Sequence, residues 1–389
     1  MSSETNARGG SDNRGEVRAV PDRCPGALTA HQAADGALAR VRLPGGRLTS
    51  EQLLVLARAA TDLSTGSMEL SSRGNIQFRS VTDTDELARR LADADLLPSP
   101  THERVRNILA SPLSGRVGGL TDVRQLIADL DLALISHPEL AALPGRTLFA
   151  LDDGRGDVIA PGPDFAVQAV DDTTYALILA GNDSGARIDR SRVVDVLVDA
   201  ARSFVEFRTT EWRLRELDEG PARVLASLGL RRGTPTSLPV ASENIPPVGW
   251  LTQSDGRVTL GGVLALGTLD ARLAEFLAAV DKPIVVTPWR SLIVCDLDED
   301  VADTVVRVLA PLGLIFDENS PWIEASACTG SPGCEKSHSD VRADLTDAVD
   351  TLQITPGQRQ HWSGCERRCG RPAGDVLDVV AGPTGYRVS

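Results

Sequence analysis

The chain has 389 residues, which is enough for two or three domains and too many for a small binding module. Hydrophobic residues make up 42% of it and charged residues 24%, which excludes a mostly disordered or fibrous protein. The net charge of -14 repels a phosphate backbone, so nucleic acid is not an expected partner. Because no apolar run reaches about 18 residues, we expect no membrane span and no membrane partner.

The N-terminal residues 1–20 are polar and glycine-rich and lack the apolar core of a signal peptide. They predict a disordered tail on a cytoplasmic protein. In a reducing compartment, the six cysteines are expected to be metal ligands or buried thiols rather than disulfides.

The first structured segment predicts a turn, a helix and a strand. Residues 44–46 (PGG) break the chain, Thr49 or Ser50 can cap a helix, and apolar residues recur at helical spacing as far as Leu63. Residues 68–78 are strand-like, and a second helix is expected at 84–96.

The middle of the chain predicts mixed structure. Residues 123–143 and 192–207 have helical periodicity, and residues 147–180 resemble short strands divided by Gly and Asp turns. Residues 233–247, rich in Pro, Ser and Thr, form the clearest linker.

The order of the first segment returns near residue 256. Residues 256–259 (GRVT) resemble 46–49 (GRLT), a helix is expected between Leu269 and Val280, and a strand at 283–297 precedes a helix at 298–312. Within that strand, residues 287–294 align with 71–78. Two copies predict a pseudo-symmetric domain, and the alternative is chance similarity between common α/β segments.

Four cysteines gather near the C-terminus in the pattern C-x5-C-x30-C-x3-C: Cys328, Cys334, Cys365 and Cys369. Four thiolates on glycine-rich loops can surround a 4Fe-4S cluster, because glycine allows close approach of the backbone. A zinc site and unligated buried thiols remain as alternatives. Cys295 lies in an apolar strand and is expected in the core.

The cysteine pattern and the repeated halves together resemble the sirohaem-dependent nitrite and sulfite reductase family, over nearly the whole chain from about residue 24. The resemblance implies that the four cysteines hold a 4Fe-4S cluster and that Cys369 also bridges to a sirohaem iron. Residues 71–77 (SSRGNIQ) resemble the family's first-repeat strand, whose arginine, here Arg73, faces the tetrapyrrole. Residues 104–112 (RVRNILASP) similarly place Arg106 in that pocket.

One motif departs from the reductases of this family, which carry two active-site lysines after a Leu-Pro turn. The matching residues 143–148 are LPGRTL, so Arg146 replaces one lysine and Leu148 the other. Arginine barely releases a proton and leucine has none to donate, which argues against multi-proton reduction of an anion. Arg146 remains a candidate contact to the tetrapyrrole.

The closest resemblance is to the precorrin-3B synthase branch of the family. It implies a monooxygenase of cobalamin biosynthesis that uses dioxygen to convert precorrin-3A into precorrin-3B by hydroxylation and lactone formation. An assimilatory nitrite or sulfite reductase is the first alternative, and a non-catalytic tetrapyrrole- or metal-binding protein is the second.

The expected cofactor is a 4Fe-4S cluster, with sirohaem or a second iron in addition. The expected ligand is precorrin-3A or a similar polycarboxylate tetrapyrrole. No G-x-G-x-x-G motif follows a strand, so electrons are expected from NAD(P)H through a separate reductase or a ferredoxin. Candidate carboxylate-binding side chains are Arg73, Arg79, Arg106, Arg116, Arg146, Arg367, Arg368 and Arg371.

The expected fold class is α+β and nitrite/sulfite reductase-like, with duplicated ferredoxin-like half-domains forming a pseudo-symmetric domain beside cluster- and tetrapyrrole-binding α/β domains. The expected units are a tail (1–20), a first ferredoxin-like half (21–97), a first tetrapyrrole-binding domain (98–232), a linker (233–247), a second half (248–318) and a cluster-binding domain (319–389).

Overall fold

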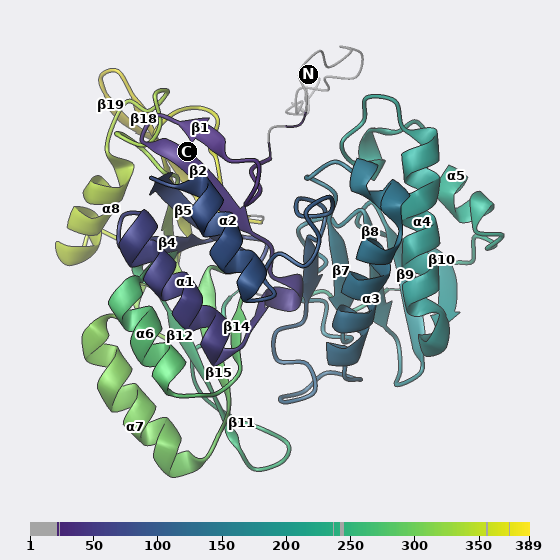
Figure 1. Cartoon of the computed structure of the whole chain (residues 1–389), viewed down its shortest axis with the longest axis horizontal. Helices are drawn as coiled ribbons and strands as arrows, with labels where there is room; N and C mark the ends of the chain where they lie inside the picture. Colours follow the sequence, from purple (N-terminus) through teal and green to yellow (C-terminus); the bar gives the residue numbers. More distant parts are fainter. Residues whose placement is uncertain (1–21, 23, 236, 242–244, 355–356, 373) are drawn as a thin grey trace, which may run out of the picture.

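The computed structural model describes residues 22, 24–235, 237–241, 245–354, 357–372 and 374–389. The predicted tail at 1–20 lies outside the described residues. The chain forms two lobes, one built from both ends of the described chain and one from its middle (Figure 1). Within the described ranges, no helix is long and apolar enough to cross a membrane.

The first ferredoxin-like half forms a five-stranded sheet in the order β1-β2-β5-β4-β13, whose last strand comes from the second half. Thr49 caps its first helix. Its side chain accepts a hydrogen bond from the Gln52 backbone N–H, and the Gln52 side chain accepts one from the Thr49 backbone N–H. The elements of this half are β1 (His31–Ala33), β2 (Gly36–Val41), β3 (Arg47–Leu48), α1 (Ser50–Leu63), β4 (Ser67–Leu70), β5 (Ile76–Val81) and α2 (Thr84–Asp93).

The second half forms a matching sheet in the order β11-β12-β15-β14-β3. Asp270 caps its first helix by accepting from the Arg272 backbone N–H. The elements of this half are β11 (Gly249–Thr252), β12 (Val258–Val263), β13 (Thr268–Asp270), α6 (Ala271–Ala279), β14 (Ile284–Val286), β15 (Ser291–Leu297) and α7 (Glu299–Leu309).

The two halves exchange edge strands. Strand β3 of the first half pairs with β14 of the second, with Leu48 opposite Ile284, and β13 pairs with β4, with Leu269 opposite Met68. Helices α1 and α6 lie side by side (Figure 1), and one hydrophobic core runs through both halves. The predicted duplication is therefore confirmed as a single interlocked body.

The structure corrects one alignment between the repeats. Residues 46–49 correspond to 267–270, because each stretch leaves a short 3-10 turn, forms the exchanged strand and ends in the helix cap. Residues 256–259, with which the sequence pattern matched them, instead lead into β12, the counterpart of β2. Glycine followed by a polar and an apolar residue begins many strands, so this local match was not specific.

The two predicted strands at 68–78 and 283–297 are each a hairpin. Gly74 and Arg290 occupy equivalent turn positions with φ of 63° and 59°, a conformation that reverses the chain. In both turns a hydroxyl accepts a hydrogen bond from a backbone N–H. The Asn75 N–H donates to Ser71 Oγ at 3.1 Å, and the Ser291 N–H donates to Thr287 Oγ1 at 3.4 Å. The alignment of 71–78 with 287–294 is thus confirmed.

The middle domain is built on a five-stranded sheet in the order β10-β9-β8-β7-β6, in which β6, β7 and β8 run parallel. Helices α3 and α4 cover one face of it (Figure 1). The helix predicted at 123–143 ends before Pro138, which begins a 3-10 turn. The elements are β6 (Ile108–Ala110), α3 (Arg124–Ser136), β7 (Phe149–Asp152), β8 (Phe165–Ala169), β9 (Thr174–Leu179), β10 (Asn182–Asp189), α4 (Val193–Phe207) and α5 (Gly220–Ser227).

The C-terminal segment adds a four-stranded sheet and one helix. Strands β16, β17 and β18 run parallel and β19 closes the sheet in the antiparallel direction. The elements are β16 (Ala325–Ala327), α8 (Val341–Asp350), β17 (Gln360–Ser363), β18 (Leu377–Gly382) and β19 (Gly385–Val388).

The strand exchange predicts a strong requirement for glycine at position 46. Gly46 has φ of 69°, and a Cβ atom there would collide with the Val286 carbonyl of the other half. Gly66 has a similar φ of 78° but open space around it. We expect Gly66→Ala to lower the free energy of unfolding by about 1 to 2 kcal/mol through backbone strain. Gly46→Ala should cost about 1 to 3 kcal/mol more through overpacking.

Urea unfolding of the two variants measures this difference. Equal losses of stability in Gly46→Ala and Gly66→Ala would contradict the close approach of the two halves at this point.

Candidate functional site

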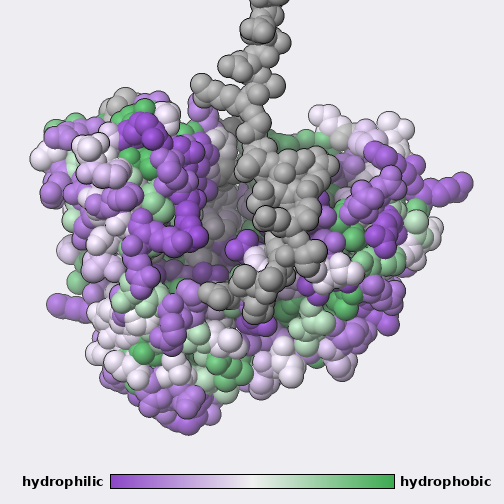
Figure 2. Space-filling view, turned by 90° about the horizontal axis from the view of Figure 1, so that it is seen from above, coloured by the Kyte–Doolittle hydropathy of each residue, from purple (hydrophilic) through white to green (hydrophobic). Residues whose placement is uncertain are grey.

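A cavity of about 390 Å³ lies where both halves, the middle domain and the C-terminal segment meet. The two equivalent hairpin turns reach it, one with Arg73 and the other with Trp289 and Arg290. Leu148 lines it from the middle domain, and Trp322 from the C-terminal segment. Viewed from above, hydrophilic side chains border the hollow between the two lobes (Figure 2).

Arg73 reaches the cavity from the turn of the first half. Its Nη1 donates to the Gly145 carbonyl at 3.4 Å and its Nη2 to the Arg146 carbonyl at 3.1 Å. Burial lowers the pKa of Arg73 to about 10, and Arg213 adds to that shift. No carboxylate of the described chain forms an ion pair with Arg73, so its charge is held by neutral carbonyl groups.

Arg290 occupies the equivalent turn of the second half. It donates to the carbonyl of Ala327 at 3.4 Å and of Gly370 at 3.1 Å, and these residues adjoin Cys328 and Cys369. Burial lowers the pKa of Arg290. Like Arg73, it has no carboxylate ion-pair partner among the residues that the structure describes.

Arg290 was not among the residues predicted from the sequence. The alignment of its turn with residues 71–75 could have indicated it, but the sequence pattern predicts one continuous strand there. Two further arginines of the cavity wall were also missed, Arg213 and Arg359.

Two of the cavity arginines are already neutralised. Arg213 contacts buried Asp164 at 2.8 Å, and Arg371 contacts Asp378 at 2.9 Å. They differ in this respect from Arg73 and Arg290, which have no carboxylate ion-pair partner within the described ranges.

The structure does not bring the Arg106 guanidinium into this cavity. Its Nε and Nη2 each lie 2.7 Å from a carboxylate oxygen of Asp131, beside a separate, smaller cavity. Arg146 is exposed and lies over the Trp212 ring, 4.7 Å from its centroid, so only its carbonyl supports Arg73.

The other arginine candidates are also engaged in ion pairs or lie outside the cavity wall. Arg79 pairs with Asp35 at 2.6 Å and Arg116 with Asp296 at 2.8 Å. Arg367 is exposed, and Arg368 lies 3.7 Å from Asp378. Of the arginines that the sequence selected, Arg73 and Arg371 line the cavity.

The four C-terminal cysteines are all free thiols. Burial raises the pKa of Cys369, and the other three thiols raise it further. Among the described residues, no three of these thiols lie within 4.8 Å of one another, whereas three aspartate side chains do. Thiolates around one zinc ion at about 2.3 Å would lie about 3.8 Å apart. The thiols are therefore spaced too widely for one zinc ion to bind three of them in this arrangement.

The loops around the thiols also fit a cluster. The Gly364 backbone N–H donates to Cys328 Sγ at 3.2 Å, as in cluster sites where amides hydrogen-bond to sulfur. A side chain at Gly364 would collide with Ser337. Cys295, in contrast, is buried in the core as predicted, and burial raises its pKa to about 11.

His361 lies between the cavity and the thiols in a fully buried position. Its ring nitrogens contact Ser326 Oγ at 2.9 Å and the Cys369 carbonyl at 3.2 Å. Burial lowers its pKa to about 4, and Arg290 contributes to this shift, so the ring is neutral at pH 7. These contacts give His361 a structural role in orienting the cysteine loop.

The lysines do not restore the proton donors that the LPGRTL motif lacks. Leu148 is buried and lines the cavity, whereas neither Lys282 nor Lys336 reaches it. The departure noted in the sequence therefore falls inside the cavity itself.

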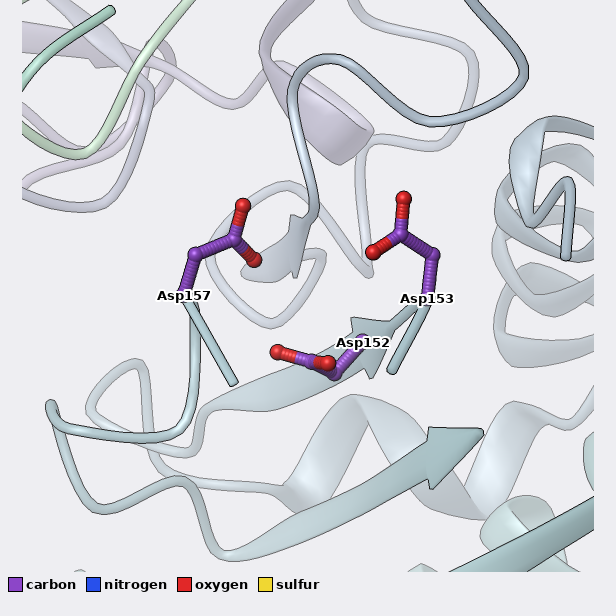
Figure 3. A group of neighbouring side chains, drawn as sticks. All are labelled: Asp152, Asp153 and Asp157. Atoms are coloured by element: carbon purple, nitrogen blue, oxygen red, sulfur yellow. The ribbon is translucent and has the colours of Figure 1, made fainter. Parts of the chain in front are cut away.

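Three carboxylates meet at the end of β7: Asp152, Asp153 and Asp157 (Figure 3). Asp152 accepts from the backbone N–H groups of Gly154 and Gly156, both at 2.9 Å, and Asp153 forms a bidentate pair with Arg155. These contacts account for the positions of Asp152 and Asp153 without a metal ion. Asp157 alone of the three lines the cavity.

Asp157 was not among the residues predicted from the sequence. Residues 152–157 (DDGRGD) have the composition of an ordinary surface turn, and no pattern distinguishes the one carboxylate that lines the cavity. Its place next to the cavity depends on the parallel pairing of β6 with β7.

Comparisons with known proteins agree with this architecture. Residues 31–94 match the model of the nitrite/sulfite reductase ferredoxin-like half domain. Precorrin-3B synthase of Sinorhizobium sp is 28% identical, over 93% of this chain and 81% of its own. Sulfite reductase (ferredoxin) 2 of Mycolicibacterium paratuberculosis is 26% identical, over 85% of this chain and 67% of its own. The structure of Mycobacterium tuberculosis NirA protein superposes with a TM-score of 0.78 at 20% identity, over 90% and 73%.

The fold is therefore that of the nitrite and sulfite reductases, as predicted, and residues 31–94 match that family's ferredoxin-like half domain. Within the family it is a homologue of precorrin-3B synthase, and its named homologues are oxidoreductases.

The cysteine geometry predicts that each of the four thiols is needed for the cluster, since losing one exposes an iron site to solvent. We expect Cys334→Ser to bind clearly less iron and sulfide than the wild type after anaerobic reconstitution. The matched control is Cys295→Ser, which should keep the full content of both. Full iron and sulfide in Cys334→Ser would contradict the assignment.

Proposed function

We propose that this protein is a precorrin-3B synthase, an oxygen-dependent monooxygenase that converts precorrin-3A into precorrin-3B in cobalamin biosynthesis. The observation that carries the proposal is the pair of half-buried arginines, Arg73 and Arg290, which line one cavity without carboxylate ion-pair partners among the described residues. Arg290 also contacts the backbone next to the four-cysteine site.

The charge of the cavity supports a polycarboxylate ligand. A buried positive charge without a counter-ion is costly, and a bound carboxylate removes that cost through a charge-assisted hydrogen bond. Precorrin-3A carries several acetate and propionate groups around its macrocycle. Trp289, Trp322 and the apolar Leu148 offer surfaces against which such a ring can pack.

The wall of the cavity favours oxygenation over reduction of a small anion. Reduction of sulfite or nitrite consumes many protons, and the position that holds a lysine in the reductases is Leu148 here. The 28% identity to a precorrin-3B synthase over 93% of the chain points the same way.

The reaction adds one oxygen atom to the macrocycle. Precorrin-3A, dioxygen, two electrons and two protons give precorrin-3B and water. In this balance the acetate group that closes the lactone is written in its protonated form. A 4Fe-4S cluster bound by Cys328, Cys334, Cys365 and Cys369 would supply the electrons, which are expected from NAD(P)H through a reductase or ferredoxin. Sirohaem or a second iron is the proposed source of oxygen activation, since dioxygen reacts poorly with closed-shell molecules. The remaining tasks of binding and orientation fall to the cavity side chains.

The test is turnover by the reconstituted protein. Protein purified without oxygen, with its iron and sulfide measured, is mixed with precorrin-3A, a reducing system and isotopically labelled dioxygen. We expect precorrin-3B with one labelled oxygen atom. Reduction of sulfite or nitrite without conversion of precorrin-3A would instead identify a reductase, and zinc without iron or sulfide would identify a non-catalytic protein.

The arginine geometry predicts the contribution of each half to binding. Arg73→Leu and Arg290→Leu should each remove a charge-assisted hydrogen bond worth about 1.5 to 3 kcal/mol. Affinity for precorrin-3A should then fall about ten- to a hundredfold in anaerobic titrations. Arg73→Lys should recover part of the loss, because a point charge does not reproduce the guanidinium fork.

Arg307→Leu serves as the matched control, since Arg307 is exposed on α7 and pairs only with Asp303. It should bind precorrin-3A normally. Wild-type affinity in both Arg73→Leu and Arg290→Leu, with the cluster intact, would show that these arginines hold no ligand.

A further inference from the structure

The proposed reaction consumes protons inside the cavity, and the side chains that deliver them in the reductases are absent. The two protons per turnover end on the oxygen atom that leaves as water. Arg146 is exposed and Leu148 carries no proton, so the cavity needs another acid. This inference rests on the proposed function and names a residue for it.

Asp157 is the carboxylate in the wall of the main cavity. Parallel strands β6 and β7 end side by side, and Ser111 follows β6 directly. Ser111 Oγ donates to Asp157 Oδ1 at 2.6 Å and also accepts the Asp153 backbone N–H at 3.1 Å. The carboxyl group is thus fixed at one oxygen, while the second oxygen has Arg155 Nε at 3.8 Å as its charged neighbour.

The surroundings of Asp157 favour its acid form. Burial, and after it the charge of Asp152, raise the pKa of Asp157 to about 7 against the lowering effects of Ser111 and Arg155. Asp153 lies in the same loop but is paired with Arg155. Across the cavity, the charged side chains in the wall are the arginines Arg73, Arg213, Arg290, Arg359 and Arg371.

We propose that Asp157 is the general acid of the oxygenation reaction. In this step a bond forms between the macrocycle and one oxygen atom, and the bond between the two oxygen atoms breaks. The donor protein supplies two electrons, and the departing oxygen takes one proton from the Asp157 carboxyl group and one from solvent to leave as water. Asp157 is then reprotonated from solvent, and Ser111 holds its carboxyl group in place between turnovers.

Asp157→Asn tests this role because the amide oxygen keeps the hydrogen bond from Ser111 but the group no longer titrates. Turnover at about pH 6 should fall at least about a hundredfold, the scale of general acid catalysis. Binding of precorrin-3A and cluster absorbance should stay at wild-type values. Asp172→Asn, the same substitution at an exposed position of the middle domain, should leave turnover unchanged.

The pH profile separates catalysis from mere folding. Because the acid form is the active one, wild-type turnover should decline above about pH 7 by about tenfold per pH unit. Ser111→Ala removes a hydrogen bond that lowers the pKa of Asp157, so its decline should move to higher pH. Infrared spectroscopy of the resting protein should show a carboxylic acid band that titrates over the same range and is missing from Asp157→Asn.

Two outcomes would overturn the proposal. In a wild type that oxygenates precorrin-3A, an unchanged rate and pH profile in Asp157→Asn would exclude Asp157 as the acid and leave the proposed function standing. A wild type with intact cluster that never oxygenates precorrin-3A would contradict the proposed function and, with it, the role of Asp157 in that reaction.

Discussion

Two half-buried guanidinium groups without carboxylate ion-pair partners among the described residues, Arg73 and Arg290, are the constraint on which the rest of this site depends. Each is held by two backbone carbonyls, which satisfy hydrogen bonds but do not neutralise charge. Burying such charges costs free energy that folding alone does not return. A ligand with several carboxylates would offset that cost, so the cavity favours a polycarboxylate substrate.

The interlocked halves explain how those two charges come to face the same space. Because β3 and β13 are exchanged, the equivalent hairpin turns of the two sheets reach one cavity from opposite sides. Arg290 also contacts the backbone on both sides of the cysteine site, so the same side chain links the cavity to the thiols. The middle domain completes the wall with the ends of its parallel strands, which is where α/β sheets usually place their functional groups.

The sequence could predict sites marked by a local residue pattern. It could not predict sites that depend on contacts between residues far apart in the chain. The cysteine spacing around Cys328 and Cys369 and the motif around Arg73 are local patterns of this kind. The structure brings Arg73 to the cavity wall, and Gly370, next to Cys369, also lines it. Arg106 lies in an equally specific motif, but it forms an ion pair with Asp131 of the following helix, which neutralises its charge. Arg290 and Asp157 were missed because a hairpin turn and a parallel strand pair, rather than a motif, bring them to the cavity.

Binding of uroporphyrin, a stable tetrapyrrole with eight carboxylates, tests the central claim most directly when it is compared with its neutral octaamide. Both have the same macrocycle, so the difference in affinity measures the contribution of charge. We predict that fluorescence titration of the 4Fe-4S-reconstituted protein detects binding of the acid, weakened by salt, and no binding of the amide. Equal affinity for both compounds, or binding of neither, would contradict a cavity organised by the uncompensated charges of Arg73 and Arg290.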